Sequence, residues 1–164
     1  MLQFDLTNLS GARLGERLSF SLDEGPQQFD DIRVAFLRGW VRFTRVERGI
    51  LIEASLNTQI EVECVRCLDP IPQPVKLEVE ETIGLAGRPR PGIPYRLTEE
   101  GWFDVSPLFR EQVWVALPMK PLCRPDCRGI CLECGANLNW EACSCQKSDL
   151  DPRLAALADF LKKD

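Results

Sequence analysis

The chain has 164 residues, of which 45% are hydrophobic, and its formal net charge is −5. This length suits one ordinary domain with a hydrophobic core, and no apolar run approaches the roughly 18 residues of a membrane-spanning helix. The acidic balance disfavours non-specific binding to nucleic acid, which depends mostly on phosphate neutralisation. Because the chain contains no histidine, catalytic triads, Cys–His dyads and His-ligated zinc sites are excluded. We therefore expect no enzyme and no membrane partner, and the sequence identifies no small-molecule substrate.

The first residues, Met1 to Thr7, lack the marks of a secretory signal. They contain no basic region followed by an apolar run and a small-residue cleavage site. We therefore expect a cytoplasmic protein, and thiols stay reduced in that compartment.

Residues 1–83 have the pattern of antiparallel strands, because apolar and polar residues alternate along several short runs. Arg48-Gly49 is a turn signal between two of these runs. Two further strands flank the motif Cys64-Val-Arg-Cys67, which we therefore place in a hairpin tip over residues 64–74. The expected strands are 18–22, parts of 34–46, 50–56, 59–63 and 75–83.

Residues 84–101 are rich in glycine and proline and predict a loop. A helix is expected over residues 106–117, with Ser106 as its N-cap and Pro107 at the first helical position. Pro118 prevents its continuation. The helix should pack on the sheet through Phe109, Val113 and Ala116, with Leu108 and Val115 beside them.

Eight cysteines are the most informative feature of the chain, and six of them lie within residues 123–145. Thiolates two to three residues apart can point at one ion, because a tight turn brings both sulfurs to about 2.3 Å from it. A cysteine-only set leaves no obvious open coordination position, so the pattern predicts structural zinc, with two ions per chain. The predicted ligands are Cys64, Cys67, Cys123, Cys127, Cys131, Cys134, Cys143 and Cys145.

Disulfides, iron–sulfur clusters and redox chemistry are the competing interpretations. In a reducing compartment such spacings more often bind metal. A thioredoxin-like role for Cys64 and Cys67 needs a C-x-x-C motif that opens a helix, and the following Leu68-Asp69-Pro70-Ile71-Pro72 cannot begin one cleanly. Zinc is therefore the favoured interpretation.

The eight cysteines divide into two sets of four in two ways. In the favoured division the ligands within 131–145 form one compact set, and the pair at 123–127 joins the hairpin pair, which clamps the C-terminal third onto the sheet. Gly135 permits the left-handed turn that a metal knuckle commonly needs. In the other division the ligands within 123–134 form one set, and the pair at 143–145 joins the hairpin. Compact closure favours the first division modestly.

A last helix is expected from Asp151, with Pro152 at its first position and lysines in its last turn. It is amphipathic, and both docking on this domain and engagement of a partner remain open. Its apolar residues are Leu154, Leu157, Ala158 and Leu161.

Together these elements predict an α+β fold. It consists of an antiparallel β-sheet or partly closed barrel with a packing helix, a Cys-rich zinc-binding segment and a C-terminal amphipathic helix. We expect residues 1–118 to form the sheet domain, and residues 119–164 to be stapled onto it.

Residues 32–52 contain five arginines against one acid, interleaved with aromatic side chains. Arginine contacts phosphate, and both arginine and aromatic rings stack on unpaired bases. If the run is a strand, Arg38, Trp40 and Arg42 share one face, and with Arg45 they form a candidate RNA-binding surface. The alternative is an ordinary polar outer face with Trp40 packed in the core.

The cysteine motifs carry a resemblance to a known family. Cys64-Val-Arg-Cys67, the run from Cys123 to Asn139 that contains Cys127-Arg-Gly-Ile-Cys131 and Cys134-Gly-Ala-Asn-Leu-Asn139, and the closing run from Asp151 to Leu157 occur in the expected order. The chain resembles the bacterial YceD-like family, the large ribosomal RNA subunit accumulation proteins. The resemblance implies a role in synthesis, processing or stability of large-subunit (23S) ribosomal RNA.

The favoured function is therefore a non-enzymatic, zinc-stabilised ribosome-biogenesis factor. Its partner would be a ribosomal RNA precursor or a large-subunit ribosomal protein. The alternative is a zinc-stapled adaptor for protein–protein interaction without direct RNA contact. An RNA-processing nuclease would need acidic metal-binding clusters, which the sequence does not identify.

Overall fold

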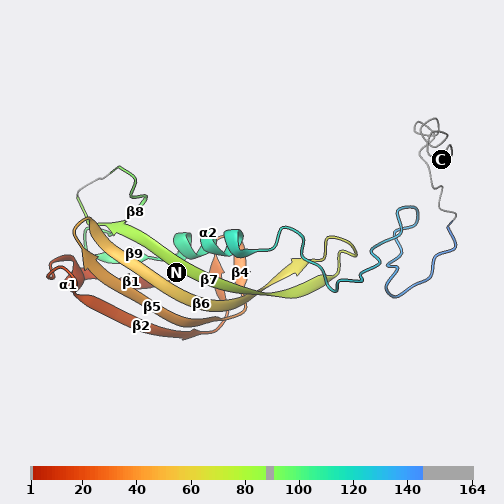
Figure 1. Ribbon diagram of the computed structural model, residues 1–164, viewed down its shortest axis with the longest axis horizontal. Helices are drawn as coiled ribbons and strands as arrows, with labels where there is room; N and C mark the ends of the chain where they lie inside the picture. The colour runs from red at the N-terminus through yellow and green to blue at the C-terminus, as the bar shows by residue number, and fades with distance from the viewer. Residues whose placement is uncertain (1, 88–90, 146–164) are drawn as a thin grey trace, which may run out of the picture.

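The computed structural model describes residues 2–87 and 91–145 as an elongated molecule built on one long, curved sheet (Figure 1). The fold is α+β, and the sheets are mostly antiparallel and stay open rather than closing into a barrel in this part of the chain. The elements are β1 (Gln3–Asp5), α1 (Thr7–Ser10), β2 (Arg17–Glu24), β3 (Gln27–Phe29), β4 (Ile32–Val34), β5 (Leu37–Val46), β6 (Gly49–Glu63), β7 (Pro70–Gly84), β8 (Tyr95–Arg96), β9 (Trp102–Asp104) and α2 (Ser106–Ala116).

The hairpin of β5 and β6 forms the centre of the main sheet, with β2 beside β5 and β7 beside β6. Val46 pairs with Gly49, so the turn consists of Glu47 and Arg48 and lies one residue before the predicted position. Gly49 instead opens β6, where a Cβ atom would lie 2.0 Å from the carbonyl oxygen of Ile83. The two strands predicted at 50–56 and 59–63 are one continuous strand.

Strands β6 and β7 extend beyond the rest of the sheet and carry the first cysteine pair at their tip (Figure 1). The tip is shorter than predicted, because β7 begins at Pro70 rather than at residue 75. Pro70, Pro72 and Pro74 all pair in register with β6. Proline has no N–H to donate, so these residues must turn their nitrogens to the free edge of the strand, where proline is tolerated. The tip is thus a tight turn over residues 64–69.

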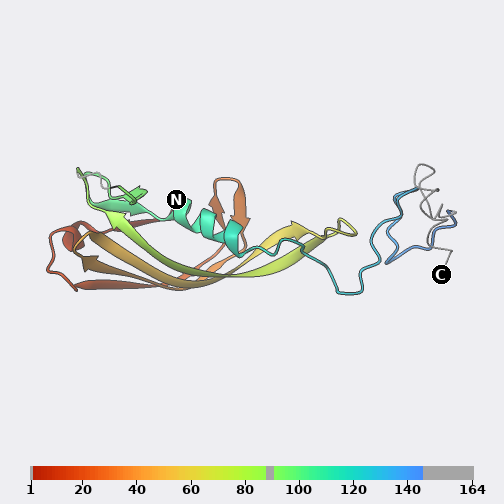
Figure 2. The same cartoon turned by 45° about the horizontal axis from the view of Figure 1, so that its top comes forward.

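Helix α2 lies across one face of the curved sheet (Figure 2). It buries Leu108, Phe109 and Val113, and the ring of Phe109 meets that of Phe29 edge-to-face at 6.3 Å. The predicted packing face is too wide, because Ala116 is exposed and Val115 is 79% exposed. Burial of an aromatic ring of this kind typically contributes about 3–5 kcal/mol relative to alanine.

The start of α2 is not capped by the Ser106 side chain, contrary to the prediction from the sequence, but is held by other groups. The Ser106 side chain makes no capping bond, and its hydroxyl accepts a hydrogen bond from the Leu2 backbone N–H instead, at 3.1 Å. The carboxylate of Asp104 accepts a hydrogen bond from the Ser106 backbone N–H at 2.9 Å. The helix ends at Ala116, before Pro118, as predicted.

Part of the predicted loop at 84–101 has regular structure. Strand β8 pairs in parallel with β7. Strand β9 begins just after the predicted loop and pairs with β1. Phe4 of β1 packs against Phe20 and Phe43, at centroid distances of 4.9 and 5.1 Å. This small sheet ties the N-terminus to the start of α2.

Beyond α2, the described chain from residue 117 to 145 contains turns and one isolated bridge between Ile130 and Asn137. The predicted terminal helix, with Leu154, Leu157 and Leu161, lies outside the described residues. The predicted division of the chain after residue 118 stays a prediction. None of the described helices is long and apolar enough to cross a membrane.

Candidate metal centres

The structure brings the eight cysteines together in two groups of four, with the sulfur atoms of each group within 4.8 Å of one another. This is the favoured division of the sequence prediction, and the other division does not occur. The first centre is Cys64, Cys67, Cys123 and Cys127, and the second centre is Cys131, Cys134, Cys143 and Cys145.

The sulfur separations fit a tetrahedral ion rather than disulfides. In the first centre, Cys64 Sγ lies 3.9 Å from Cys127 Sγ, and Cys67 Sγ lies 3.7 Å from Cys123 Sγ. A disulfide bond is about 2.05 Å long. Four sulfurs at about 2.3 Å from a central ion form a tetrahedron with edges of about 3.8 Å. The observed spacing therefore matches a tetrathiolate site, and all eight thiols are free.

The hairpin tip forms one half of the first centre. The Leu68 N–H donates to the Cys64 carbonyl, and the Cys64 N–H donates to the Asp69 carbonyl, each at 2.9 Å. Leu68 takes a left-handed φ of 61°, which is uncommon for a residue with a large side chain. This tight turn buries both Cys64 and Cys67.

The segment after α2 supplies the other half by running back along the tip. The Val65 N–H donates to the Pro121 carbonyl at 3.0 Å. The guanidinium of Arg66 donates to the Cys127 carbonyl at 2.9 Å. These bonds hold Cys127 against the hairpin, although the two segments are some sixty residues apart in the sequence.

The second centre forms a compact knuckle. The Gly135 N–H donates to the Cys131 carbonyl at 2.9 Å, and the Cys131 N–H donates to the Ala136 carbonyl at 2.8 Å. Gly135 has a φ of 74°, which confirms the left-handed turn predicted after the second ligand.

Backbone N–H groups favour the thiolate form of one cysteine in each centre. The N–H of Cys67 is the main cause that lowers the pKa of Cys64 to about 6, against the opposing effect of burial. The N–H groups of Cys134 and Glu133 lower the pKa of Cys131 to about 6 in the same way. Hydrogen bonds to the charged form stabilise it, as a metal ligand requires.

Neighbouring sulfur atoms raise the pKa of other cysteines in the same two centres. The sulfur of Cys134, followed by burial, raises the pKa of Cys145 to about 12. The Asp69 N–H acts in the lowering direction on Cys67, yet burial and the contact with Cys64 raise the pKa of that thiol. Four thiolates this close repel one another unless a cation lies between them. The donor set thus suits a divalent ion in a closed structural site.

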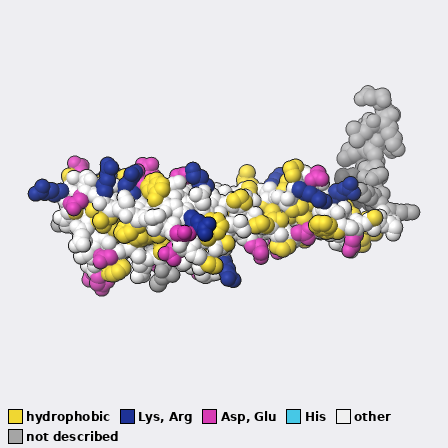
Figure 3. All heavy atoms as spheres, turned by 90° about the horizontal axis from the view of Figure 1, so that it is seen from below, with side chains coloured by type: hydrophobic (Ala, Val, Ile, Leu, Met, Phe, Trp, Pro, Cys, Tyr) yellow, Lys and Arg dark blue, Asp and Glu magenta, His cyan; other side chains and the backbone are white. Residues whose placement is uncertain are grey.

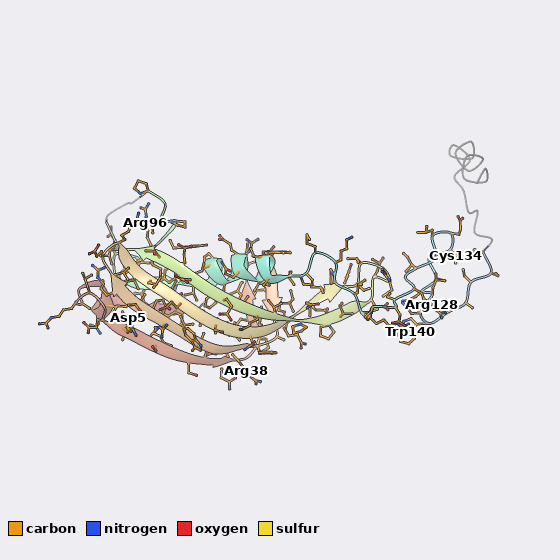
Figure 4. The ribbon with its side chains drawn as sticks, viewed as in Figure 1. Asp5, Arg38, Arg96, Arg128, Cys134 and Trp140 are labelled. Carbon is orange, nitrogen blue, oxygen red and sulfur yellow. The ribbon has the colours of Figure 1, made fainter. Side chains whose placement is uncertain are left out.

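The candidate RNA-binding residues lie on the sheet, away from the metal centres. Figure 4 shows Arg38 on the sheet, whereas Arg128, Cys134 and Trp140 lie beyond the tip of β6 and β7. Arg38, Trp40 and Arg42 share one face of β5, as predicted. Trp40 is 43% exposed, so its ring is not packed in the core.

Acidic partners already bind the two arginines of this face. Arg38 Nε lies 2.7 Å from Asp23, and Arg42 makes two hydrogen bonds to the Glu53 carboxylate, at 2.9 and 3.0 Å. The bond to Arg42 lowers the pKa of Glu53. Lys/Arg and Asp/Glu side chains are interspersed along the face seen in Figure 3, which shows no broad basic area.

Arg45 differs from the other three candidates, because its side chain binds the backbone on both sides of the β5–β6 turn. Its guanidinium donates to the carbonyl of Gly49 at 2.6 Å and also to that of Val46. The structure thus assigns Arg45 a role in closing the hairpin.

The sequence interpretation missed a group of polar residues around the first centre. Asn139 donates its amide to Cys127 Sγ at 3.4 Å, and Asn137 donates to both carboxylate oxygens of Asp69, at 2.9 and 3.1 Å. Their signal in the sequence is the pair of asparagines in the short loop between two cysteine pairs.

Comparison with known proteins identifies the chain's family. The family model described as "Large ribosomal RNA subunit accumulation protein YceD" matches residues 52–161. An uncharacterised protein of Mycobacterium tuberculosis is 28% identical, over 98% of this chain and 74% of its own length. A maize protein named as a chloroplastic YCED homolog 1 is 26% identical, over 65% of this chain and 47% of its own length. No solved structure matches. Since the family model spans most of the chain, including both cysteine centres, the chain belongs to the YceD family of large ribosomal RNA subunit accumulation proteins.

Proposed function

We propose that this chain is a non-enzymatic, zinc-stapled ribosome-biogenesis factor that acts in the cytoplasm. It supports the synthesis, processing or stability of large-subunit ribosomal RNA. Membership of the YceD family supports the ribosomal part of this proposal, because the family is named for the accumulation of this RNA. The two all-cysteine centres support a structural role for the metal, since four thiolates fill a tetrahedral shell and leave no position for a substrate.

Zinc is the proposed ion at both centres. Cysteine-only tetrahedral sets select zinc or iron–sulfur clusters over magnesium, calcium or manganese, which prefer oxygen ligands. The two sets hold their ligands at the spacing of a single ion, with sulfur pairs at 3.7 and 3.9 Å in the first centre. A single zinc ion in each tetrathiolate set therefore accounts for the geometry.

The proposed partner is a ribosomal RNA precursor or a large-subunit ribosomal protein. On the sheet, Arg38 and Arg42 are already paired with Asp23 and Glu53, so a phosphate must either share each guanidinium with the carboxylate or displace it. Either arrangement reduces the net gain from the contact, because repulsion by the carboxylate or the loss of the ion pair offsets part of it. These ion pairs, together with the net charge of −5, favour the adaptor function as the second candidate.

Co-sedimentation of the zinc-loaded chain with pre-ribosomal particles at several salt concentrations tests the proposal. Binding to large-subunit precursors, and a lower level of large-subunit RNA in cells that lack the protein, is the expected result. A steep fall in binding with salt indicates RNA contact, and a shallow one indicates a protein partner. No association with precursor particles at any salt concentration would refute the ribosomal role.

A further inference from the structure

The loop that closes the second metal centre also forms a wall of the first. Residues 135–142 join the two halves of the second cysteine set, yet Asn139 within this loop donates its side-chain amide to Cys127 Sγ of the first set, at 3.4 Å. A ligand of one centre is therefore hydrogen-bonded by a residue of the loop that joins the two ligand pairs of the other.

Asn139 is itself held in place by the segment that carries Cys127. The side-chain carbonyl oxygen of Asn139 accepts hydrogen bonds from the Arg128 backbone N–H and from the Arg124 guanidinium, both at 2.9 Å. Its amide also donates to the side-chain oxygen of Asn137 at 2.9 Å. The amide is thus satisfied on both sides, which fixes the direction of its N–H bond to the sulfur.

The same loop holds the hairpin tip through Asp69. The Asp69 carboxylate accepts hydrogen bonds from Asn137, and from the Trp140 indole N–H at 3.4 Å. Asp69 is two residues after Cys67, and its own carbonyl accepts the Cys64 N–H. The loop of the second centre therefore contacts both halves of the first, at Cys127 and at the tip.

We propose that Asp69, Asn137 and Asn139 are positioning residues of the first centre, and that they couple metal loading at the two centres. A metal ion in the second centre closes its loop and places Asn137 and Asn139 for the first. Once an ion in the second centre has ordered this loop, an ion that binds at the first centre no longer incurs the entropy cost of ordering it. The coupling is reciprocal, because each centre must affect the other by the same factor. This inference rests on the metal-binding part of the proposed function, but not on its ribosomal part.

Cobalt(II) titration of the reduced full-length chain, followed by thiolate–cobalt absorption, tests the coupling. Variants Cys64→Ser and Cys143→Ser assign the absorption to the first and second centre. We expect Asn139→Ala to weaken cobalt binding at the first centre by about 10- to 100-fold, the usual effect of removing an outer-shell partner. Cys143→Ser should weaken the first centre to a similar extent, and the two changes combined should cost less than the product of their separate effects.

Two further variants separate positioning from general damage. Glu141→Ala is the matched control, because its exposed side chain lies in the same loop and the loop's described contacts come from other side chains. Asp69→Asn should weaken the first centre, and adding Asn137→Asp should restore it, since the exchanged pair can form an amide–carboxylate hydrogen bond in the reverse direction. Circular dichroism of each variant should show the sheet intact.

Three results would contradict the inference: cobalt affinity of Asn139→Ala equal to that of Glu141→Ala, independent losses in the combined variant, or no rescue by the exchanged pair. If the unaltered chain bound no cobalt, the zinc proposal itself would fail. If it bound two ions independently, only the coupling would fail. Neither outcome concerns the association with precursor particles.

Discussion

Two glycines hold positions in the sheet where a side chain cannot fit. A Cβ atom at Gly39 would lie 2.1 Å from the Ser55 carbonyl oxygen, and one at Gly49 would lie 2.0 Å from that of Ile83. Both glycines have positive φ angles, at 149° and 157°. The sequence could suggest a turn near Gly49, but only the register of three strands shows that the backbone of a neighbour occupies the space.

Replacing Gly49 with alanine should therefore lower the free energy of unfolding by about 1–3 kcal/mol or more, since local backbone strain typically costs this much. Gly25→Ala is the control, because no atom lies within 4 Å of a Cβ there. Urea denaturation of both variants measures the difference. Equal stabilities would show that the sheet accommodates a Cβ atom at residue 49 without strain.

On the arginine face, the sequence predicted where the side chains lie but not which partners they bind. Strand alternation was enough to place Arg38, Trp40 and Arg42 together. The ion pairs depend on the neighbours across β2 and β6, since Arg38 pairs in register with Asp23 and Arg42 with Glu53. The sequence alone does not fix that register. Arg45 could not be separated from the others for the same reason.

Replacing Arg38 and Arg42 together with glutamine should weaken association with ribosomal RNA precursors if this face contacts RNA. Removing each arginine–phosphate ion pair should reduce the salt slope of binding by about one. Arg33→Gln with Arg48→Gln removes the same charge elsewhere and serves as the control. Arg45 is left unchanged, because its replacement would disturb the turn. An unchanged salt slope would exclude this face and favour the adaptor function.

At the scale of elements, the β6–β7 hairpin connects the sheet to the first metal centre. Its existence was predictable, because two alternating runs flank a C-x-x-C motif. Its length was not, since Pro70, Pro72 and Pro74 ordinarily argue against a strand. They are compatible with β7 only because that strand has a free edge next to the tip. The grouping of the cysteines followed from loop closure, but the polar contacts around them required the three-dimensional path of residues 135–142.

Replacing Cys64 with serine should release the segment after α2 from the hairpin. Structural metal contributes directly to folding, so removal of one ligand frees the segment that the ion held. Limited proteolysis in excess zinc should then cut between residues 118 and 130. Val65→Ser, a change of a half-exposed side chain in the same turn, should remain resistant. Cleavage confined to residues 64–69 would show that the ion does not hold the two segments together.

At the scale of the whole molecule, the sheet and the cysteine region have separate interiors. The main core contains the sheet and α2, whereas Cys64, Cys67 and Cys127 form a small cluster of their own with Ile71 and Leu122. The sequence assigned residues 1–118 to the sheet domain and 119–164 to the cysteine segment, and that boundary stays a prediction. The stability of the sheet should therefore depend little on metal.

Chelation under reducing conditions should open the region from residue 117 to 145 and leave the sheet folded. Hydrogen exchange should rise in this region, including the hairpin tip, and stay slow in β5 and in the adjoining part of β6. Re-addition of zinc should restore protection at the tip. Global exchange throughout β5 and β6 after chelation would mean that the metal centres support the whole fold rather than one end of it.

Counting metal ions per chain tests most directly whether the eight cysteines form two structural metal centres. The protein should be purified under reducing conditions, without added chelator, and analysed for zinc and iron together with its free thiols. We expect two zinc ions per chain, no iron, and eight thiols that react only after chelation. One ion per chain would contradict the second centre, and no ion with eight reactive thiols, or with disulfides, would contradict both.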